Sequence, residues 1–418
     1  MRFERKKYLE RLIAGRGNGM VKIVTGVRRC GKSYLLFNLF IDWLKAHETQ
    51  EDHIIGLQLD DFRHRKLRQP DVLLDYVDTH LPHDGKVTYI ILDEIQLVDH
   101  FVEVMLSLMH LPKVEVYVSG SNSRFLSSDV VTEFRGRGQE IRVRPLSLME
   151  YIEGTGKEFH TALHEYFVYG GLPQVALLSS EEEKGNFLRN MYEVTYLRDV
   201  IERNRLRNAE GLRELVRVLA SGIGASSNPK RIADTFSSVE GTKLAYTAVK
   251  DYIIHLQDAF LIEEALRYDV KGRKYIGTES KYYFADPGIR NVVLNFRQVE
   301  ETHIMENVIY NELRSRGALV DVGLVESWTR DASGKTQRRN LEVDFVCNRG
   351  SERVYIQSAY ALPSPEKVEQ EERSLKIISD SFRKIVVVKD DILLRRSDAG
   401  VVTMSLREFL TRADSLEA

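Results

Sequence analysis

Short apolar segments alternate with amphipathic segments over the first 145 residues of the chain. The apolar segments have the composition of buried strands and lie at residues 20–25, 54–59, 87–92, 114–118 and 140–143. The amphipathic segments repeat their apolar positions at helical spacing, and the expected helices lie at residues 3–14, 33–40, 71–81 and 99–111. This alternation predicts an α/β domain, residues 1–150, with a mainly parallel sheet and right-handed crossovers.

The rest of the chain divides by pattern into three parts, residues 151–206, 207–285 and 286–418. The first is mostly helical and is expected to be a connector. In the second, three helical segments precede two short strands, an order typical of a winged helix-turn-helix with residues 243–258 as the recognition helix. Acidic and basic residues are nearly balanced there, so a structural arm or a protein contact remains an alternative to DNA reading.

The last part shows a helix, three strands, a helix and a strand, which is the order of restriction-endonuclease-like domains. Such nucleases place an acid on the second strand and Glu-x-Lys on the third, to hold a metal ion and activate water. Asp344 fits the first position, with Glu306 or Glu342 as a second carboxylate. Gln357 and Ala359 stand where the third strand needs its Glu and Lys. We therefore expect this part to keep the fold without nuclease activity.

The strand at residues 20–25 leads into the phosphate-binding P-loop pattern G-x-x-x-x-G-K-[ST]. The pattern and the residue after it supply the expected ATP-binding residues: Gly26, Val27, Arg28, Arg29, Cys30, Gly31, Lys32, Ser33 and Tyr34. The two glycines let the backbone turn tightly, so that successive N–H groups face phosphate oxygens. Lys32 would reach the β- and γ-phosphates as a catalytic residue, and the Ser33 hydroxyl would bind Mg²⁺.

The strand at residues 87–92 ends in Asp93 and Glu94, the Walker B pattern of an apolar strand followed by two acids. Asp93 would hold Mg²⁺ through water. Glu94 would polarise the attacking water and is the second expected catalytic residue. An ordinary acidic turn after a buried strand is the alternative, and the P-loop upstream argues against it.

Two further residues are candidates for contact with the nucleotide. Asn122 follows the strand at residues 114–118 and would sense the γ-phosphate, with Ser121 as the alternative. Arg137, or Arg135, would reach a nucleotide in the same or in a neighbouring subunit, with a solvated basic loop as the alternative. Nucleotides bind beyond the carboxyl ends of parallel strands, so the P-loop, the Walker B acids and Asn122 are expected at one edge of the sheet.

Composition indicates a globular protein and does not indicate a binding partner. The chain has 418 residues, 43% hydrophobic and 29% charged, which is typical of a globular protein with two or three domains. A net charge of −2 gives no signal for nucleic acid or membrane over the whole chain. No apolar segment is long enough for a membrane helix and no signal peptide is evident, so a cytoplasmic protein is expected.

The two cysteines, Cys30 and Cys347, make no disulfide framework, in keeping with a reducing compartment. Cys30 lies among the P-loop N–H groups beside Arg28 and Arg29. Positive surroundings favour a thiolate, so one expectation is a reactive Cys30 that bound ATP protects. A side chain that points into the core is the alternative.

Several stretches together give the chain a specific resemblance. They are residues 25–33, 92–96 (Leu-Asp-Glu-Ile-Gln), 120–122 (Gly-Ser-Asn), 145–147 (Pro-Leu-Ser), 169–173 (Tyr-Gly-Gly-Leu-Pro) and 281–290 (Lys-Tyr-Tyr-Phe-Ala-Asp-Pro-Gly-Ile-Arg). With these, the chain resembles the bacterial and archaeal family of predicted ATPases of the AAA superfamily that carry a C-terminal domain of unknown function. The resemblance implies an ATPase domain, then a winged helix and a nuclease-like domain, and it names no substrate.

The leading hypothesis is a Mg²⁺-dependent ATPase whose hydrolysis switches the arrangement of its C-terminal domains, with double-stranded DNA as one candidate partner. Two alternatives stay open. One is a nucleotide-gated interaction module that turns over little ATP and presents its C-terminal part to a protein partner. The other is an ATP-controlled nuclease. The sequence leaves the oligomeric state open.

Overall fold

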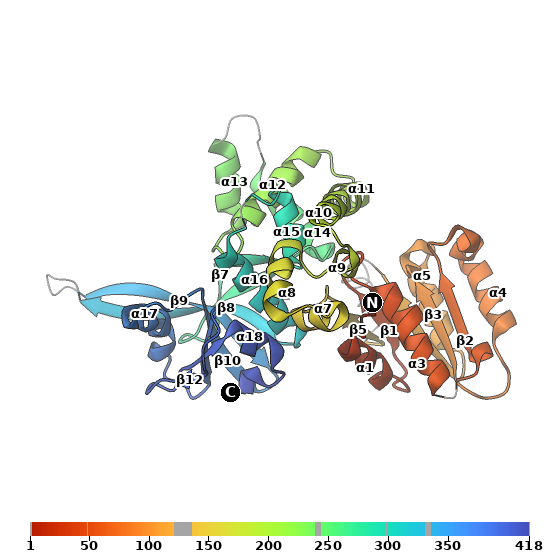
Figure 1. Cartoon of the computed structure of the whole chain (residues 1–418). Coiled ribbons are helices and arrows are strands. Elements are labelled where there is room, and N and C mark those ends of the chain that lie inside the picture. Colours follow the sequence, from red (N-terminus) through yellow and green to blue (C-terminus); the bar gives the residue numbers. More distant parts are fainter. Residues whose placement is uncertain are drawn as a thin grey trace. The chain divides into compact units, whose positions relative to one another are not determined.

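The computed structural model describes residues 2–47, 49–120, 136–238, 244–297, 299–330 and 336–417 (Figure 1). The chain divides into two compact units. The first unit comprises Met1–Leu146 with two short segments, Leu172–Gln174 and Asp258–Phe260. The second unit comprises Ser147–Gly171, Val175–Gln257 and Leu261–Ala418.

The first unit is built on a five-stranded sheet with the order β2-β3-β4-β1-β5. Its strands are β1 (Val21–Thr25), β2 (Ile54–Gln58), β3 (Thr88–Asp93), β4 (Val114–Ser119) and β5 (Gly138–Arg142). All neighbouring pairs are parallel, which confirms the predicted parallel sheet. Strands β1 and β3 are buried at every position, because strands inside a parallel sheet are covered on both faces.

Helices flank this sheet and fill the core between them and the strands. They are α1 (Lys6–Ala14), the continuous helix α2 (Lys32–Tyr34), η1 (Leu35–Phe40) and α3 (Ile41–Ala46), then α4 (Pro70–His80) and α5 (Phe101–Met109). Short 3₁₀ helices η2 (Glu51–His53), η3 (Phe62–Arg68) and η4 (Ile95–Leu97) complete the connections. Leu73 and Val77 of α4 and Met105 and Leu108 of α5 pack with the strands in one apolar core.

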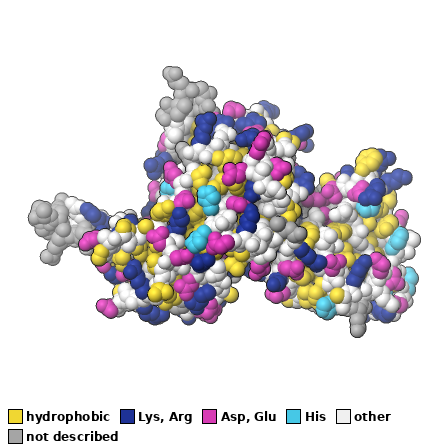
Figure 2. All heavy atoms as spheres, in the orientation of Figure 1, with side chains coloured by type: hydrophobic (Ala, Val, Ile, Leu, Met, Phe, Trp, Pro, Cys, Tyr) yellow, Lys and Arg dark blue, Asp and Glu magenta, His cyan; other side chains and the backbone are white. Residues whose placement is uncertain are grey.

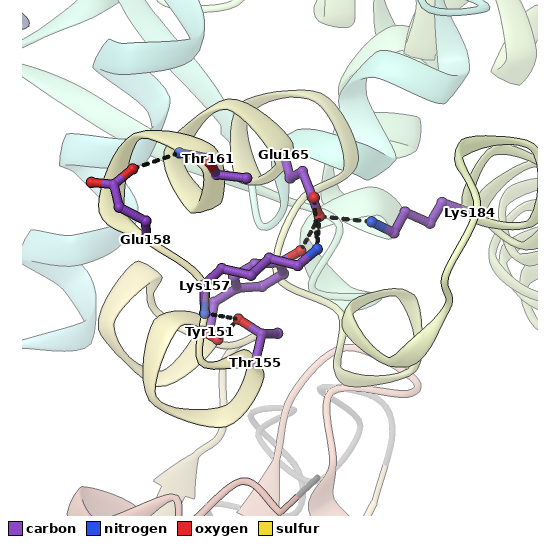
Figure 3. A network of polar contacts seen from close by, with 7 residues as sticks. All are labelled: Tyr151, Thr155, Lys157, Glu158, Thr161, Glu165 and Lys184. Atoms are coloured by element: carbon purple, nitrogen blue, oxygen red, sulfur yellow. Dashed lines mark hydrogen bonds and ion pairs between the residues drawn. The ribbon is translucent and has the colours of Figure 1, made fainter.

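The second unit begins with a run of helices. They are α7 (Leu148–Thr155), α8 (Phe159–Tyr169), α9 (Pro173–Leu177), α10 (Glu181–Asn190), the π-helix η6 (Met191–Leu197) and α11 (Arg198–Asn204). Glu165 of α8 ties three of these segments together, since it accepts hydrogen bonds from Tyr151 Oη at 2.7 Å, Lys157 Nζ at 2.6 Å and Lys184 Nζ at 2.7 Å (Figure 3). Burial by itself raises the pKa of Glu165, but these hydrogen bonds outweigh it and hold the pKa at about 2.

Three helices and a hairpin follow, in the order that the sequence predicts. The helices are α12 (Ala209–Ser221), α13 (Pro229–Ser238) and α14 (Tyr246–Asp258), and the hairpin strands are β6 (Ile262–Asp269) and β7 (Lys274–Phe284). Helices α15 (Pro287–Val293) and α16 (Glu301–Ser315) come next. The assignment of these helices and the hairpin to a winged helix stays a prediction.

An eight-stranded sheet with the order β12-β13-β11-β10-β9-β8-β6-β7 organises the rest of the second unit. Its remaining elements are β8 (Leu319–Arg330), β9 (Thr336–Arg349), β10 (Glu352–Ala359), α17 (Pro365–Ile377), β11 (Arg383–Val388), β12 (Arg395–Arg396), β13 (Val402–Ser405), α18 (Leu406–Thr411) and η7 (Ser415–Glu417). Strand β6 pairs in parallel with β8 through Arg267–Val322 and Asp269–Leu324. The sheet therefore continues across the predicted boundary between residues 285 and 286.

Among the helices of the described residues, none is both long enough and apolar enough to cross a membrane.

Candidate functional site

The P-loop follows the carboxyl end of β1 and can be built only with glycine at its first position. Gly26 has φ 138°, and a Cβ atom there would lie 2.0 Å from the backbone oxygen of Val143. Val143 follows β5, the strand that pairs with β1. No side chain fits between the two chain segments, so the first residue of the phosphate-binding loop must be glycine.

The second glycine starts the helix that follows the loop. Gly31 has φ 97° and ψ 24° and caps the N-terminus of α2, where its carbonyl accepts a hydrogen bond from Leu35 N at 2.9 Å. Lys32 is buried, and its Nζ donates to Gly26 O at 3.0 Å and to Val27 O at 3.2 Å. The ammonium group is thus held over the loop at the N-terminus of a helix, a place where backbone N–H groups attract anions.

The other predicted loop residues lie in different surroundings. Arg29 is exposed and has φ 64°, and Arg28 and Tyr34 are half-buried. Val27 is buried, and so is Cys30, whose Sγ lies 3.4 Å from Val143 O. The Cys30 side chain therefore packs into the interior behind the loop, as in the alternative that the sequence left open.

Asp93 and Ser33, the two predicted Mg²⁺ ligands, meet below the P-loop. Asp93 ends β3 and is buried, and Ser33 of α2 lies near enough to lower the pKa of its carboxyl. Burial raises the pKa of Asp93, and the hydroxyls of Ser119 and Ser33 oppose this only in part. A carboxylate and a hydroxyl near each other, next to a loop that fits phosphate, form a donor set that Mg²⁺ prefers.

Ser119 is a site residue that the sequence interpretation missed. It is the last residue of β4, and its hydroxyl donates to Asp93 Oδ1 while accepting from Glu94 N at 3.1 Å. It thereby fixes both Walker B acids from the neighbouring strand. A serine at the end of an apolar strand was the only signal for this role in the sequence, and the structure shows that this serine is fully buried.

Glu94 lies one residue beyond Asp93 in a constrained conformation. Its φ is 53°, in the left-handed region that residues other than glycine rarely adopt, and its side chain is half-buried. Gln96 Nε2 donates to Glu94 Oε2. Backbone strain of this kind persists where the surrounding structure holds it, here through Ser119 and Gln96.

Of the two further predicted nucleotide contacts, only Arg137 lies among the described residues. Asn122 lies outside the described residues. Arg137 is exposed, and its carbonyl accepts from Val21 N at 2.9 Å, at the first residue of β1. The P-loop follows the carboxyl end of β1, after Thr25, whereas Arg137 lies beside the amino end of β1. Arg137 is therefore at the opposite end of the strands from Lys32 and Asp93. A role for Arg137 within one chain has no support from this geometry, and a role toward a neighbouring subunit stays a prediction.

A second cluster of charged side chains lies in the second unit, around Lys281 of β7. Its Nζ is 2.9 Å from Glu306 Oε1 of α16, 2.8 Å from Glu342 Oε1 of β9 and 3.7 Å from Asp344 Oδ1 of β9. Tyr283 Oη also donates to Glu306 at 2.6 Å. The three acids that the sequence proposed for metal binding therefore surround an ammonium group.

Charge balance in this cluster sets the ionisation of its members. Burial lowers the pKa of Lys281, but the three neighbouring carboxylates outweigh it and raise the pKa above its ordinary value. Burial and the charge of Glu306 raise the pKa of Asp344 to about 7, against the opposing effect of Lys281 and the Ser358 N–H. The ammonium thus stays charged in the interior while Asp344 ionises near neutral pH.

The third-strand positions complete the picture of the cluster. Gln357 has a buried Oε1 atom without a hydrogen-bond partner, and Ala359 is buried. Tyr360 faces a different group, because its hydroxyl donates to Glu301 at 2.7 Å and accepts from Lys389 at 3.1 Å. In the sequence Lys281 stands out only as the first residue of the 281–290 motif. Its contacts arise because β7, α16 and β9 meet in the fold.

Two family models match parts of the chain. Residues 18–152 match a family model described as an AAA domain, and residues 160–300 match one described as a domain of unknown function, DUF8612. An uncharacterized protein of Haemophilus influenzae is 28% identical over 388 residues, which is 92% of each chain. An uncharacterized protein of Methanocaldococcus jannaschii is 26% identical over 376 residues, 86% of this chain and 79% of the relative.

Two solved structures are distantly similar. The Walker-type ATPase PABY2304 of Pyrococcus abyssi has a TM-score of 0.46 and 17% identity, and the match covers 70% of this chain and 96% of that one. The Aeropyrum pernix ORC1 protein in complex with DNA has a TM-score of 0.30 and 14% identity, covering 71% and 93%. The AAA part of the resemblance seen in the sequence is thus confirmed, and the winged helix and the nuclease-like domain stay predictions.

Proposed function

We propose that the first unit binds ATP together with Mg²⁺ and hydrolyses it. The observation that carries this proposal is a loop that only glycine can start, with the buried ammonium group of Lys32 held over it by Gly26 O and Val27 O. The match of residues 18–152 to an AAA domain supports it.

Each residue has a distinct part in the proposed reaction. The P-loop N–H groups and Lys32 bind and orient the phosphates, which positions the γ-phosphate for in-line attack. Ser33 and Asp93 would hold Mg²⁺, which neutralises phosphate charge when it is bound. Glu94 orients the attacking water and takes up its proton, while Ser119 keeps both acids in place.

The test separates binding from hydrolysis. Lys32→Ala removes the phosphate contact, so ATP affinity and turnover both fall, turnover by at least about a hundredfold. Glu94→Gln keeps ATP affinity within about twofold and loses turnover, because Glu94 acts on water. Lys45→Ala and Glu103→Gln, exposed changes on α3 and α5, are matched controls. Wild-type turnover in Glu94→Gln would refute the role of Glu94, and unmeasurable turnover in the wild type would favour the interaction module.

We propose further that hydrolysis switches the C-terminal part on double-stranded DNA. The supporting feature is the turn between β6 and β7, where Lys271, Arg273 and Lys274 are exposed. Replacing all three with alanine should weaken DNA binding in mobility-shift assays at two salt concentrations, without slowing basal ATP hydrolysis. Unchanged binding would move the DNA contact elsewhere.

A further inference from the structure

Strands β8 and β9 extend beyond the sheet as a two-stranded ribbon (Figure 1). Strand β6 pairs with β8 only at Arg267–Val322 to Asp269–Leu324, and β10 pairs with β9 only from Phe345 onward. From Val325–Leu341 to Arg330–Thr336 the two strands pair only with each other among the described residues. We name these residues, 325–330 and 336–341, the β8–β9 ribbon.

The ribbon carries side chains that a protein core does not use. Trp328 is 62% exposed, and every residue from Thr336 to Asn340 is exposed. Among the ribbon side chains that the structure describes there are two arginines, Arg338 and Arg339, and one acid, Glu326. Figure 2 shows basic side chains on the ribbon next to the grey segment. An exposed tryptophan beside an arginine is available for contact with a ligand.

Register assigns these side chains to faces. Trp328 lies opposite Arg338, and Ser327 lies opposite Arg339. Residues directly opposite in an antiparallel pair share a face, so one face presents Trp328 with Arg338 and the other presents Arg339. Arg338 forms an ion pair with Glu326 at the base of the ribbon, which leaves Arg339 as the arginine with the less compensated charge.

The ribbon lies next to the basic turn between β6 and β7. Lys271 Nζ donates to the backbone oxygen of Glu326 at 3.3 Å, and Val270 N donates to Leu324 O at 3.0 Å. Arg273 and Lys274 follow directly in that turn and are exposed. The exposed cations of the turn and the β8–β9 ribbon thus lie close together within the second unit.

We infer that the β8–β9 ribbon binds double-stranded nucleic acid. A two-stranded ribbon fits the major groove of B-DNA, which is about 12 Å wide. Arg338, on the same face as the exposed Trp328, and Arg339, on the other face, can contact phosphates and base edges in that groove. The inference rests on the DNA part of the proposed function and deepens it, because it moves the main contact from the turn to the ribbon.

The experiment measures binding of a fluorescent 20-base-pair duplex to the full chain by anisotropy, without nucleotide. The double variant Arg338→Gln/Arg339→Gln should bind the duplex about tenfold more weakly at low salt. The slope of log affinity against log salt concentration should become less steep by about one to two. Arg395→Gln/Arg396→Gln is the matched control, because it removes the same charge from the exposed strand β12 of the same sheet and should change affinity by less than about twofold. Arg338→Lys/Arg339→Lys keeps the charge and should stay within about threefold of the wild type.

Tryptophan fluorescence gives a second readout that does not depend on the arginine variants. The chain has two tryptophans, Trp43 and Trp328, so Trp43→Phe leaves Trp328 as the single reporter. Duplex should quench its emission with the same midpoint as the anisotropy curve. Binding without quenching, equal losses in the control variant, or no duplex binding by the wild type would each overturn the inference. ATP binding measured separately on the same proteins keeps a failure of the ATPase proposal distinguishable from a failure of the ribbon.

Discussion

The carboxylate of Asp286 accepts a hydrogen bond of 2.6 Å from the backbone N–H of Gly171. The same side chain caps α15 by accepting from Ile289 N at 3.1 Å. A Cβ atom on Gly170 would lie 2.0 Å from Asp286 Oδ1, and one on Gly288 would lie 2.1 Å from Tyr169 O. Residues 169–171 (Tyr-Gly-Gly) and residues 286–288 (Asp-Pro-Gly) therefore fit tightly against each other within the second unit.

Gly170→Ala should destabilise the second unit by at least about 3 kcal/mol. Gly170 has φ 75° and ψ −167°, a conformation that is essentially limited to glycine, and its Cβ would collide with Asp286. Gly185→Ala is the control, since Gly185 lies within helix α10 and its Cβ would meet Phe296 at 3.9 Å. Urea unfolding followed by circular dichroism measures both. Equal stability of the two variants would show that the close contact between Gly170 and Asp286 does not require glycine.

Asp286→Asn should change the pH dependence of stability. Burial raises the pKa of Asp286 to about 6, with hydrogen bonds from three backbone N–H groups only partly opposing it. The folded state binds the proton more tightly than the unfolded state, so this stabilisation is complete below about pH 4 and is lost as pH rises through 6. The loss amounts to about 3 kcal/mol.

The variant lacks this ionisation, so the gap between wild type and Asp286→Asn should narrow as pH rises from 4 to 7. Unfolding free energies at four pH values provide the measurement. Two parallel pH profiles would show that Asp286 does not titrate in this range.

The phosphate-binding loop and both Walker B acids could be predicted because local sequence dictates them. Only glycine fits at Gly26, the positive φ of Gly31 favours glycine, and an apolar strand followed by two acids can be recognised without a fold. Ser119 could not be found in this way, because its role arises from the pairing of β3 with β4. Lys281 escaped notice for the same reason, since its three acidic partners come from α16 and β9.

Element positions were predicted well, and connections between distant elements were not. The first helix and the last strand expected in residues 286–418 are α16 at Glu301–Ser315 and β11 at Arg383–Val388. Strands β12 and β13 were missed because they have two and four residues, too few for a periodic pattern. The parallel pairing of β6 with β8 joins residues more than 50 positions apart, and no local pattern records it.

Ser119→Ala should weaken Mg²⁺ binding at Asp93 and leave ATP binding by the P-loop intact. Asp93 loses the hydrogen bond that favours its charged form, and Glu94 N loses its acceptor. The Mg²⁺ concentration for half-maximal ATP hydrolysis should rise about tenfold, whereas ATP affinity without metal stays within about twofold. Ser119→Thr keeps the hydroxyl and should restore most of the affinity. Ser107→Ala, on the exposed face of α5, is the control. An unchanged Mg²⁺ dependence would remove Ser119 from the site.

Both cysteines should react slowly with a maleimide in the native protein. Cys30 is fully buried behind the P-loop, and burial raises the pKa of the buried Cys347 thiol. Labelling should become complete in urea, and Cys30→Ala should bind ATP within about threefold of the wild type. Mass spectrometry of labelled peptides identifies the sites. Fast native labelling of Cys30 that Mg-ATP prevents would place its thiol in the phosphate cradle instead.

The Lys281 cluster should not cleave nucleic acid, because an ammonium group already balances the acids that a metal ion would need. Lys281 Nζ lies within 2.9 Å of both Glu306 and Glu342, and Gln357 replaces the third-strand acid. Plasmid and single-stranded DNA, incubated with the protein in Mg²⁺ or Mn²⁺ with and without ATP, should stay intact. Cleavage that disappears in Asp344→Ala would overturn this expectation and make an ATP-controlled nuclease the leading function.

Lys281→Met tests the charge balance of the cluster by removing its cation instead of an acid. It leaves three carboxylates close together without their cation, so the second unit should lose about 3–5 kcal/mol of stability. Millimolar Mn²⁺ should return part of this loss in the variant, seen as a rise in unfolding temperature, because a divalent cation prefers grouped carboxylates. The wild type should show no such rise, since Lys281 competes for the same oxygens. A variant as stable as the wild type, or one indifferent to Mn²⁺, would mean that the acids do not depend on Lys281 for their charge balance.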